Sequence, residues 1–212
     1  GVVLESGVKK GEGAVATLLV QRGTLNTGDF ILIGDQFRKI RSLKNFLGSQ
    51  IKTSPPSSPV AISGLEYPPN AGQEFMVVKD EKAAKSLSEE RASKRRDNIL
   101  AKKGVVSLDG IFAGAGDSAK PSVNLIIKTD TNGSAEAIAG AINNLKVEEA
   151  NIKIVLDGVG PVSVNDVNLA VASEAVILGF NVRSDAAAET LAETEEIKIQ
   201  YFGIIYDLLD AV

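Results

Sequence analysis

The sequence predicts a multidomain α+β protein: an all-β unit, a long polar helix, and an α/β unit with a four-strand parallel sheet. Through residues 1–79, short apolar runs alternate with glycine-bearing turns, which is typical of antiparallel strands. From residue 121 onward, strand-like and helix-like segments alternate, which favours a parallel sheet covered by helices. A chain of 212 residues is long enough for two such units.

The all-β unit is expected to close into a barrel or pack as a sandwich, because closure protects strand edges. Residues 53–59 contain three prolines, which lack backbone donors, so this segment is expected to be a loop and not a central strand. The expected strands are residues 2–4, 14–20, 30–33, 37–43, 60–62 and 75–78.

Residues 80–104 are expected to form a linker helix. Their first half is rich in helix formers and lacks glycine and proline. We expect Asp80 to cap this helix and Gly104 to end it. A helix this polar bridges two units more often than it sits in a core. Residues 105–120 are expected to be a connecting segment, with one short helical turn over 105–112 and a loop after it.

The α/β unit covers residues 121–212. Ser163 stands three residues before Asp166, a spacing that resembles a capping box with Asp in place of Glu. The expected strands are residues 123–128, 152–157, 175–180 and 197–201, and the expected helices are 134–145, 164–172, 186–194 and a last one from 204.

Composition excludes several kinds of chemistry. Without cysteine there is no disulfide framework or thiolate nucleophile, and without histidine there is no Ser-His-Asp catalysis or histidine-ligated zinc. We assign no catalytic, cofactor-binding or metal-binding residue. The apolar runs are far shorter than the roughly 18 residues of a membrane span, so no membrane association is expected.

Charge divides the chain into a basic and an acidic half. Residues 1–104 carry 17 Lys/Arg and 11 Asp/Glu, whereas residues 105–212 carry 6 and 16. A basic half favours nucleic acid as its partner, and ordinary solvated surface charge is the alternative. The candidate RNA-binding side chains, with Phe37 and Phe46 interleaved, are Arg38, Lys39, Arg41 and Lys44. A solvated edge whose phenylalanines lie in the core is an equal alternative.

Two strand-to-helix loops in the α/β unit could hold an anion. Residues 129–136 lie where flavodoxin-like proteins bind a flavin phosphate, but they lack the G-x-x-x-x-G-K-[ST] pattern of a nucleotide cradle. Residues 158–163 begin like a dinucleotide fingerprint but have Ser163 in place of the third glycine. Tight turns with helix caps are the favoured interpretation of both loops, and a flavodoxin-like FMN-binding protein is the alternative function.

Several motifs resemble bacterial-type translation initiation factor two. Residues 13–25 (GAVATLLVQRGTL), followed by Gly28 and Asp29, closely resemble the second domain of that factor. Residues 177–186 (ILGFNVRSDA) and 201–207 (YFGIIYD) resemble its third domain. The resemblance covers nearly the whole chain. It implies a Tu-type antiparallel β-barrel in residues 1–79 and a flavodoxin-like α/β/α sandwich in residues 121–212.

The resemblance also implies a function. The family's parent protein is a GTPase, with GTP and Mg²⁺ as cofactors, that places initiator tRNA on the small ribosomal subunit and promotes joining of the large subunit. No phosphate-binding loop occurs in this chain, so the GTPase domain is expected to lie outside it. The C-terminal tRNA-binding barrel would follow Val212, so it is expected to lie outside as well. The chain itself is expected to be a monomeric, non-catalytic fragment. It would bind the small subunit and its rRNA and relay signals between those two domains.

Departures from the family pattern bear on the origin of the chain. Residues 45–58 diverge from a typical bacterial copy, and Asp157 and Gly158 stand where a histidine-containing turn is expected. These departures favour a parent in the mitochondrial matrix over one in the bacterial cytoplasm.

Overall fold

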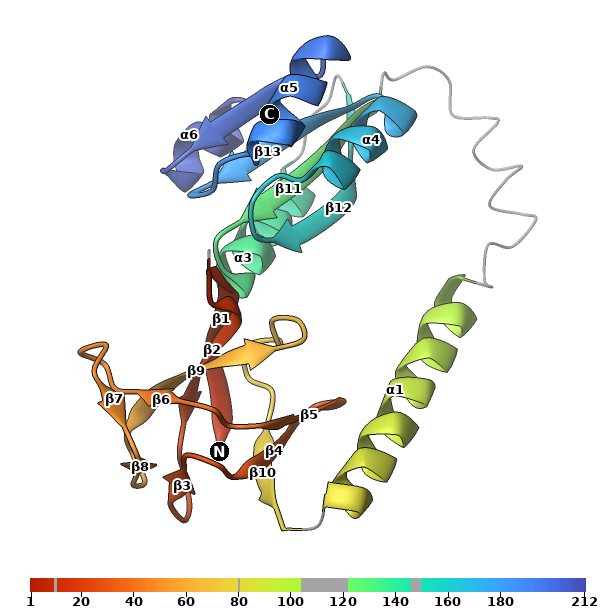
Figure 1. The fold of residues 1–212 in the computed structure, drawn as a ribbon. Coiled ribbons are helices and arrows are strands. Elements are labelled where there is room, and N and C mark those ends of the chain that lie inside the picture. The colour runs from red at the N-terminus through yellow and green to blue at the C-terminus, as the bar shows by residue number, and fades with distance from the viewer. Residues whose placement is uncertain (10, 80, 104–121, 146–149) are drawn as a thin grey trace.

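The computed structural model describes residues 1–9, 11–79, 81–103, 122–145 and 150–212. It contains an N-terminal antiparallel β unit, a long helix and a C-terminal α/β unit (Figure 1). The fold class expected from the sequence is confirmed. The expected helical turn over residues 105–112, and the proposed roles of Asp80 and Gly104, lie outside the described residues.

The β unit consists of antiparallel sheets that enclose one apolar core. Leu18, Ile31, Leu43 and Val60 come from both larger sheets, and each is at most 1% exposed. The five-strand sheet has the order β1 (Val2–Lys9), β2 (Gly13–Leu19), β9 (Pro59–Leu65), β6 (Leu43–Lys44), β7 (Gln50–Ile51). The others are β10 (Phe75–Val78), β4 (Phe30–Ile33), β5 (Gln36–Lys39), and the short pair β3 (Leu25–Asn26) and β8 (Thr53–Ser54).

Two expectations about this unit need correction. The single strand expected over residues 37–43 is two strands, β5 and β6, which belong to different sheets. The chain crosses between the sheets at Ile40, whose N–H donates to Asp29 and whose carbonyl accepts from Gly28. The proline-rich segment 53–59 is not wholly a loop: Thr53–Ser54 form β8, and Pro59 is the first residue of β9, which lies in the middle of the five-strand sheet. Proline is tolerated there because it is the first residue of the strand.

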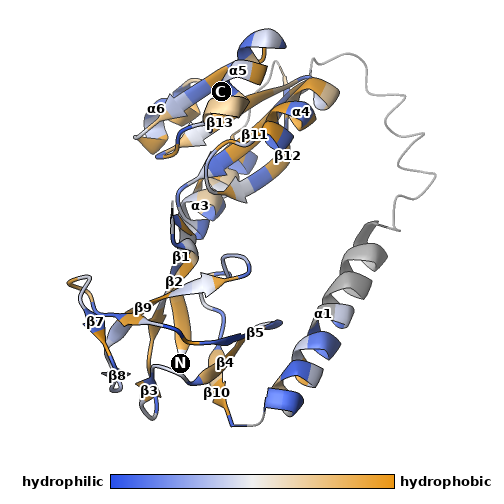
Figure 2. Ribbon diagram, viewed as in Figure 1, coloured by the Kyte–Doolittle hydropathy of each residue, from blue (hydrophilic) through white to orange (hydrophobic). Residues whose placement is uncertain are grey.

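Helix α1 (Glu81–Lys103) is seated on the barrel at its beginning. Ala84 is 1% exposed there, and the Ser88 hydroxyl donates to the carbonyl of Asp35 at 2.6 Å. The Arg91 guanidinium donates to the Gly34 carbonyl at 2.9 Å. Most of its described residues are hydrophilic, whereas apolar residues concentrate in the β unit and the α/β unit (Figure 2). The helix therefore meets the barrel through polar side chains placed on the β4–β5 turn.

The α/β unit is a parallel sheet covered on both faces. Its strands run in the order β12 (Asn151–Val159), β11 (Ser122–Thr129), β13 (Ala175–Phe180), β14 (Ile199–Phe202). This 2-1-3-4 order is the flavodoxin-like one. Two apolar clusters fill the faces: Ile138 and Leu208 belong to one, and Val167 and Ala188 to the other. They are supplied by helices α3 (Asn132–Asn144), α4 (Val164–Ser173), α5 (Ala186–Thr194) and α6 (Ile205–Asp210).

The capping box at the start of α4 is confirmed. The Ser163 N–H donates to Asp166 Oδ2 at 2.8 Å, and the Ser163 hydroxyl donates to the same oxygen at 2.8 Å. Asp166 also forms an ion pair with Lys128 on β11 at 3.2 Å, and both side chains are largely buried. One carboxylate therefore fixes the start of α4 and ties that helix to the sheet.

Candidate nucleic-acid interface

The barrel contains a long segment without negative charge, which we call the basic stretch. It comprises residues 36–65, running from β5 through β9. It holds no Asp or Glu, and its basic residues are Arg38, Lys39, Arg41, Lys44 and Lys52. A polyanion approaching this part of the barrel therefore meets repulsion only from carboxylates that other segments supply.

Two of the four expected RNA-binding residues are already paired with such carboxylates. The Arg38 guanidinium donates to Glu66 Oε2 at 2.7 Å. The Lys44 ammonium donates to Glu12, which lies in the turn between β1 and β2. This hydrogen bond, with the charge of Lys44, lowers the pKa of Glu12 below its ordinary value. The charges of Arg38 and Lys44 are therefore partly neutralised before any RNA arrives.

Lys39 and Arg41, the other two expected RNA-binding residues, are exposed to solvent. Lys39 is exposed, with its ammonium 5.2 Å from the ring centroid of Phe30, which stacks on Phe37 at 5.3 Å. Arg41 is exposed in the crossing between β5 and β6, and within the described part of the chain it has no ion pair. Arg41 and Lys39 are thus better placed for phosphate than Arg38 and Lys44.

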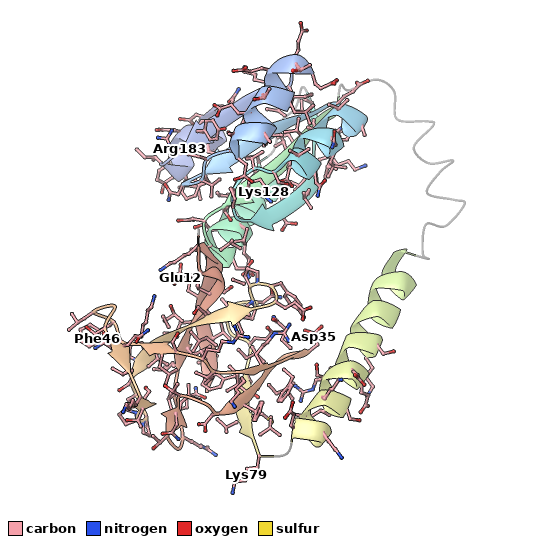
Figure 3. All side chains as sticks on the ribbon, in the orientation of Figure 1. Glu12, Asp35, Phe46, Lys79, Lys128 and Arg183 are labelled. Atoms are coloured by element: carbon pink, nitrogen blue, oxygen red, sulfur yellow. The ribbon has the colours of Figure 1, made fainter. Side chains whose placement is uncertain are left out.

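The four residues do not form one cluster. Arg38 and Lys39 lie on β5 of the three-strand sheet, whereas Lys44 lies on β6 of the five-strand sheet. In Figure 3, Asp35 before β5 and Phe46 after β6 stand on opposite sides of the barrel. The sequence suggested one continuous basic strand, and the crossing at Ile40 divides it between two sheets.

The two phenylalanines, whose exposure the sequence leaves open, differ in the structure. Phe37 is half-buried in its stack with Phe30, whereas Phe46 is 81% exposed. Leu47, which the sequence argument did not consider, is 74% exposed beside it. Lys52 was also missed. Asn45 and Gly48 flank the two apolar residues with turn chemistry, and this pattern could have indicated a hairpin tip.

The two loops considered as anion sites lie against the barrel. Thr131 caps α3 and pairs with Gly7 of β1, and Asn132 donates to Ser6 Oγ at 2.9 Å and to the Pro69 carbonyl at 2.8 Å. Ser6 is only 2% exposed. The first residues of α3 are thus engaged by protein at the place where a flavin phosphate would bind.

Glycines allow the two units to approach this closely. A Cβ on Gly7 would lie 2.5 Å from the Asp130 carbonyl oxygen, closer than real contacts allow. Gly160, at φ +114°, would place a Cβ 3.4 Å from Val8 on the barrel. Of the two glycines in the incomplete dinucleotide fingerprint, Gly160 lies in the tight turn that was expected and packs against the barrel, whereas Gly158 is part of strand β12.

Within the described residues, no group of three or more Asp, Glu, His or Cys side chains could hold a metal ion. None of the helices in the described ranges is long and apolar enough to cross a membrane.

Family comparisons agree with the fold. Residues 1–78 match the model for elongation factor G domain 2, and residues 97–212 match the model for translation-initiation factor 2. The chain belongs to the translation initiation factor IF-2 family. It is 45% identical over its full length to translation initiation factor IF-2 of Bacillus pumilus and 44% identical to that of a Psychrobacter species. It spans 30% and 23% of the lengths of these two relatives.

One solved structure resembles nearly the whole chain. The crystal structure of GDP-bound aIF5B from Aeropyrum pernix aligns with 99% of this chain and 35% of its own, at a TM-score of 0.55 and 24% identity. At this identity the likeness concerns the fold alone. It extends across the β unit, α1 and the α/β unit together.

Proposed function

We propose that this IF-2 family chain is the central, non-catalytic part of its parent factor and binds small-subunit ribosomal RNA through the barrel. The observation that carries the proposal is the basic stretch, residues 36–65, with five Lys/Arg and no Asp/Glu. Arg41 and Lys39 are exposed, and we assign them the principal phosphate contacts. Arg38 and Lys44 take a smaller part, because Glu66 and Glu12 already hold them.

The proposal also assigns a relay role to the α/β unit. We infer that this unit is a rigid spacer between the parent's GTPase and tRNA-binding domains. Its support is the contact of Asn132 with Ser6 and Pro69, which fixes α3 against β1. The described residues of the unit are strongly acidic, with 12 Asp/Glu and 4 Lys/Arg, so a large RNA footprint on it is disfavoured.

Family membership supports a proposal for the remaining partners. For the parent we propose initiator tRNA and the large ribosomal subunit as partners, and GTP and Mg²⁺ as cofactors of a domain outside this chain. The chain itself is proposed to act as a monomer. The named relatives are bacterial. For the location of the parent factor we propose the bacterial cytoplasm or the mitochondrial matrix. A flavin-binding function is not favoured, because α3 begins against the barrel.

The test is co-sedimentation with small ribosomal subunits over a series of salt concentrations. Each phosphate that a protein charge neutralises contributes about −0.7 to −0.9 to the slope of log K against log salt. We expect R41A to weaken binding and reduce the slope by about one such unit. The E66Q variant frees Arg38 and should strengthen binding, with a steeper slope.

The matched control is K198A, which removes an exposed lysine of the α/β unit. It should leave both affinity and slope unchanged. If the unmodified chain does not sediment with subunits even at low salt, the ribosome contact belongs to other parts of the parent. If R41A and K198A weaken binding equally, the attraction is nonspecific and the assignment to the barrel fails.

A further inference from the structure

The β6–β7 hairpin ends in a tip, residues 45–49, that is held in one conformation. The Asn45 side-chain oxygen accepts hydrogen bonds from the N–H groups of Leu47 at 3.0 Å and Ser49 at 2.9 Å. The Asn45 N–H donates to the Ser49 carbonyl at 2.9 Å, and Gly48 adopts φ +81° at the turn. This network fixes the backbone that presents Phe46 and Leu47.

Packing within the barrel does not explain why an aromatic residue stands at position 46. It is 81% exposed, and the apolar core is filled by other side chains, Leu43 at the base of the same hairpin among them. A polar residue at position 46 would serve the turn equally well. An aromatic ring that is held out on a fixed tip is ready to bind without a large loss of conformational freedom.

The surroundings of the tip fit an RNA strand. Pairing of Leu43 with Ile51 places Arg41 and Lys52 at the base of the hairpin. At about 3.3 Å per strand residue, Arg41 lies about 13 Å from the first residue of the tip and Lys52 about 10 Å from the last. Both are exposed, and the basic stretch around them has no acidic residue. A phosphate backbone can therefore follow the hairpin while a base reaches its tip.

A groove beside the tip can receive that base. It has a volume of about 530 Å³, within the range of small-ligand sites. Phe46 and Asn45 are among its lining residues, as are the hydroxyl-bearing Thr17 of β2 and Ser63 of β9. Glu5, Glu12 and Asp130 also line the groove, so a base and not the phosphate backbone is the part of an RNA strand that can enter it. The site thus combines an aromatic face with polar groups suited to the edge of an unpaired base.

We propose that Phe46 is a base-stacking residue, which binds one unpaired nucleotide of ribosomal RNA at the mouth of this groove while Arg41 and Lys52 contact the flanking phosphates. The inference rests on the proposed function, because the nucleotide belongs to the small-subunit RNA that the barrel binds. Stacking on Phe46 adds a contact that charge alone does not supply, because it requires an RNA base that is unpaired and outside a double helix. Double-stranded RNA offers no base face to Phe46.

The absence of tryptophan from the chain gives a direct test. The F46W variant carries a single tryptophan at the tip, and a base stacked on it should quench its fluorescence when small subunits are added. The control is Y206W, which puts a single tryptophan at a 73% exposed position on α6. We expect quenching of F46W alone. Equal quenching of both reporters, or of neither, overturns the stacking proposal.

Affinity measurements separate stacking from a general apolar contact. We expect F46A to weaken binding about 5- to 150-fold, the range for loss of one stacked base, with an unchanged salt slope because no charge is lost. F46W should bind like the unmodified chain, and F46L should be nearly as weak as F46A. If F46L binds normally, the tip meets an apolar surface on a protein and the proposal is wrong.

Failure of this inference is distinguishable from failure of the proposed function. If the unmodified chain binds subunits with a steep salt dependence and F46A binds equally well, the barrel is an RNA-binding surface that does not use Phe46. If the unmodified chain does not bind at low salt, both proposals fail.

Discussion

Asn132 offers the sharpest test of whether the two units move as one body. Its side-chain amide donates to Ser6 Oγ at 2.9 Å and to the Pro69 carbonyl at 2.8 Å, across the contact between barrel and α/β unit. Ser6 is 2% exposed and also donates to Pro69. The N132A variant removes both amide hydrogen bonds and leaves Ser6 and Pro69 bonded to each other.

The magnitude follows from the two bonds that are lost. A neutral hydrogen bond contributes about 0.5–1.5 kcal/mol net, so N132A should cost about 1–3 kcal/mol of docking free energy. At 1.4 kcal/mol per factor of ten, the docked-to-undocked ratio falls about 5- to 150-fold. The barrel core should be unaffected, because Asn132 lies on α3 and not within that core.

The assay uses the absence of cysteine from the chain. Spin labels on M76C of β10 and E193C of α5, both exposed positions, report the distance between the two units. The unmodified contact should give one narrow distance distribution, and N132A should broaden it. The control is N124A, which removes a 2.6 Å hydrogen bond to Ser173 inside the α/β unit. It should lower the stability of that unit and leave the distribution narrow.

A second variant strengthens the test. In G7A, the new Cβ meets the Asp130 carbonyl oxygen at 2.5 Å, so the units must separate or shift. Gly7 does not have a positive φ, and alanine is otherwise compatible with its strand. If both N132A and G7A keep the narrow distribution, the two units are not held together by this contact. The rigid-spacer proposal would then lose its support.

Two further predictions concern charged groups. Lys44 holds the pKa of Glu12 below its ordinary value, so the stability from this pair is present above the ordinary glutamate pKa and is lost as pH falls through the folded-state value. In a carboxyl NMR titration, K44M should return the Glu12 pKa to the ordinary range while the pKa of Glu90, lowered by its own lysine, stays unchanged. D166A should destabilise the α/β unit by about 3–5 kcal/mol in urea unfolding, because the largely buried Lys128 loses its partner. Adding K128M should recover most of that loss, and no recovery would mean that the helix cap and not the ion pair carries the effect.

Features that depend on residues close together in the sequence were predicted correctly. The boundaries of β4, β10, β13 and α5 agree with the expected segments, since each depends on a few neighbouring apolar and turn residues. The Ser163–Asp166 capping box is likewise a contact between residues three apart. The alternation of strands and helices after residue 121 also fixed the parallel sheet, because parallel strands need crossover connections.

Contacts between distant residues decided the candidate site. Arg38 meets Glu66 at a separation of 28 residues and Lys44 meets Glu12 at 32, so which charges stay available depends on where the sheets bring those carboxylates. Apolar residues predict burial, yet the hairpin turns Phe46 outward.

The sequence by itself determined the classes of the two units, their order and the positive charge of the barrel. Only the tertiary structure decided that Asn132 reaches Ser6, 126 residues away, and that Arg41 and Lys39 are the exposed members of the four candidate RNA-binding residues. The physical reason is the separation along the sequence of the residues that interact. Helix, strand and cap formation depend on neighbours along the chain, whereas the partner of a charge or an amide is set by chain paths that meet only when the whole fold has formed.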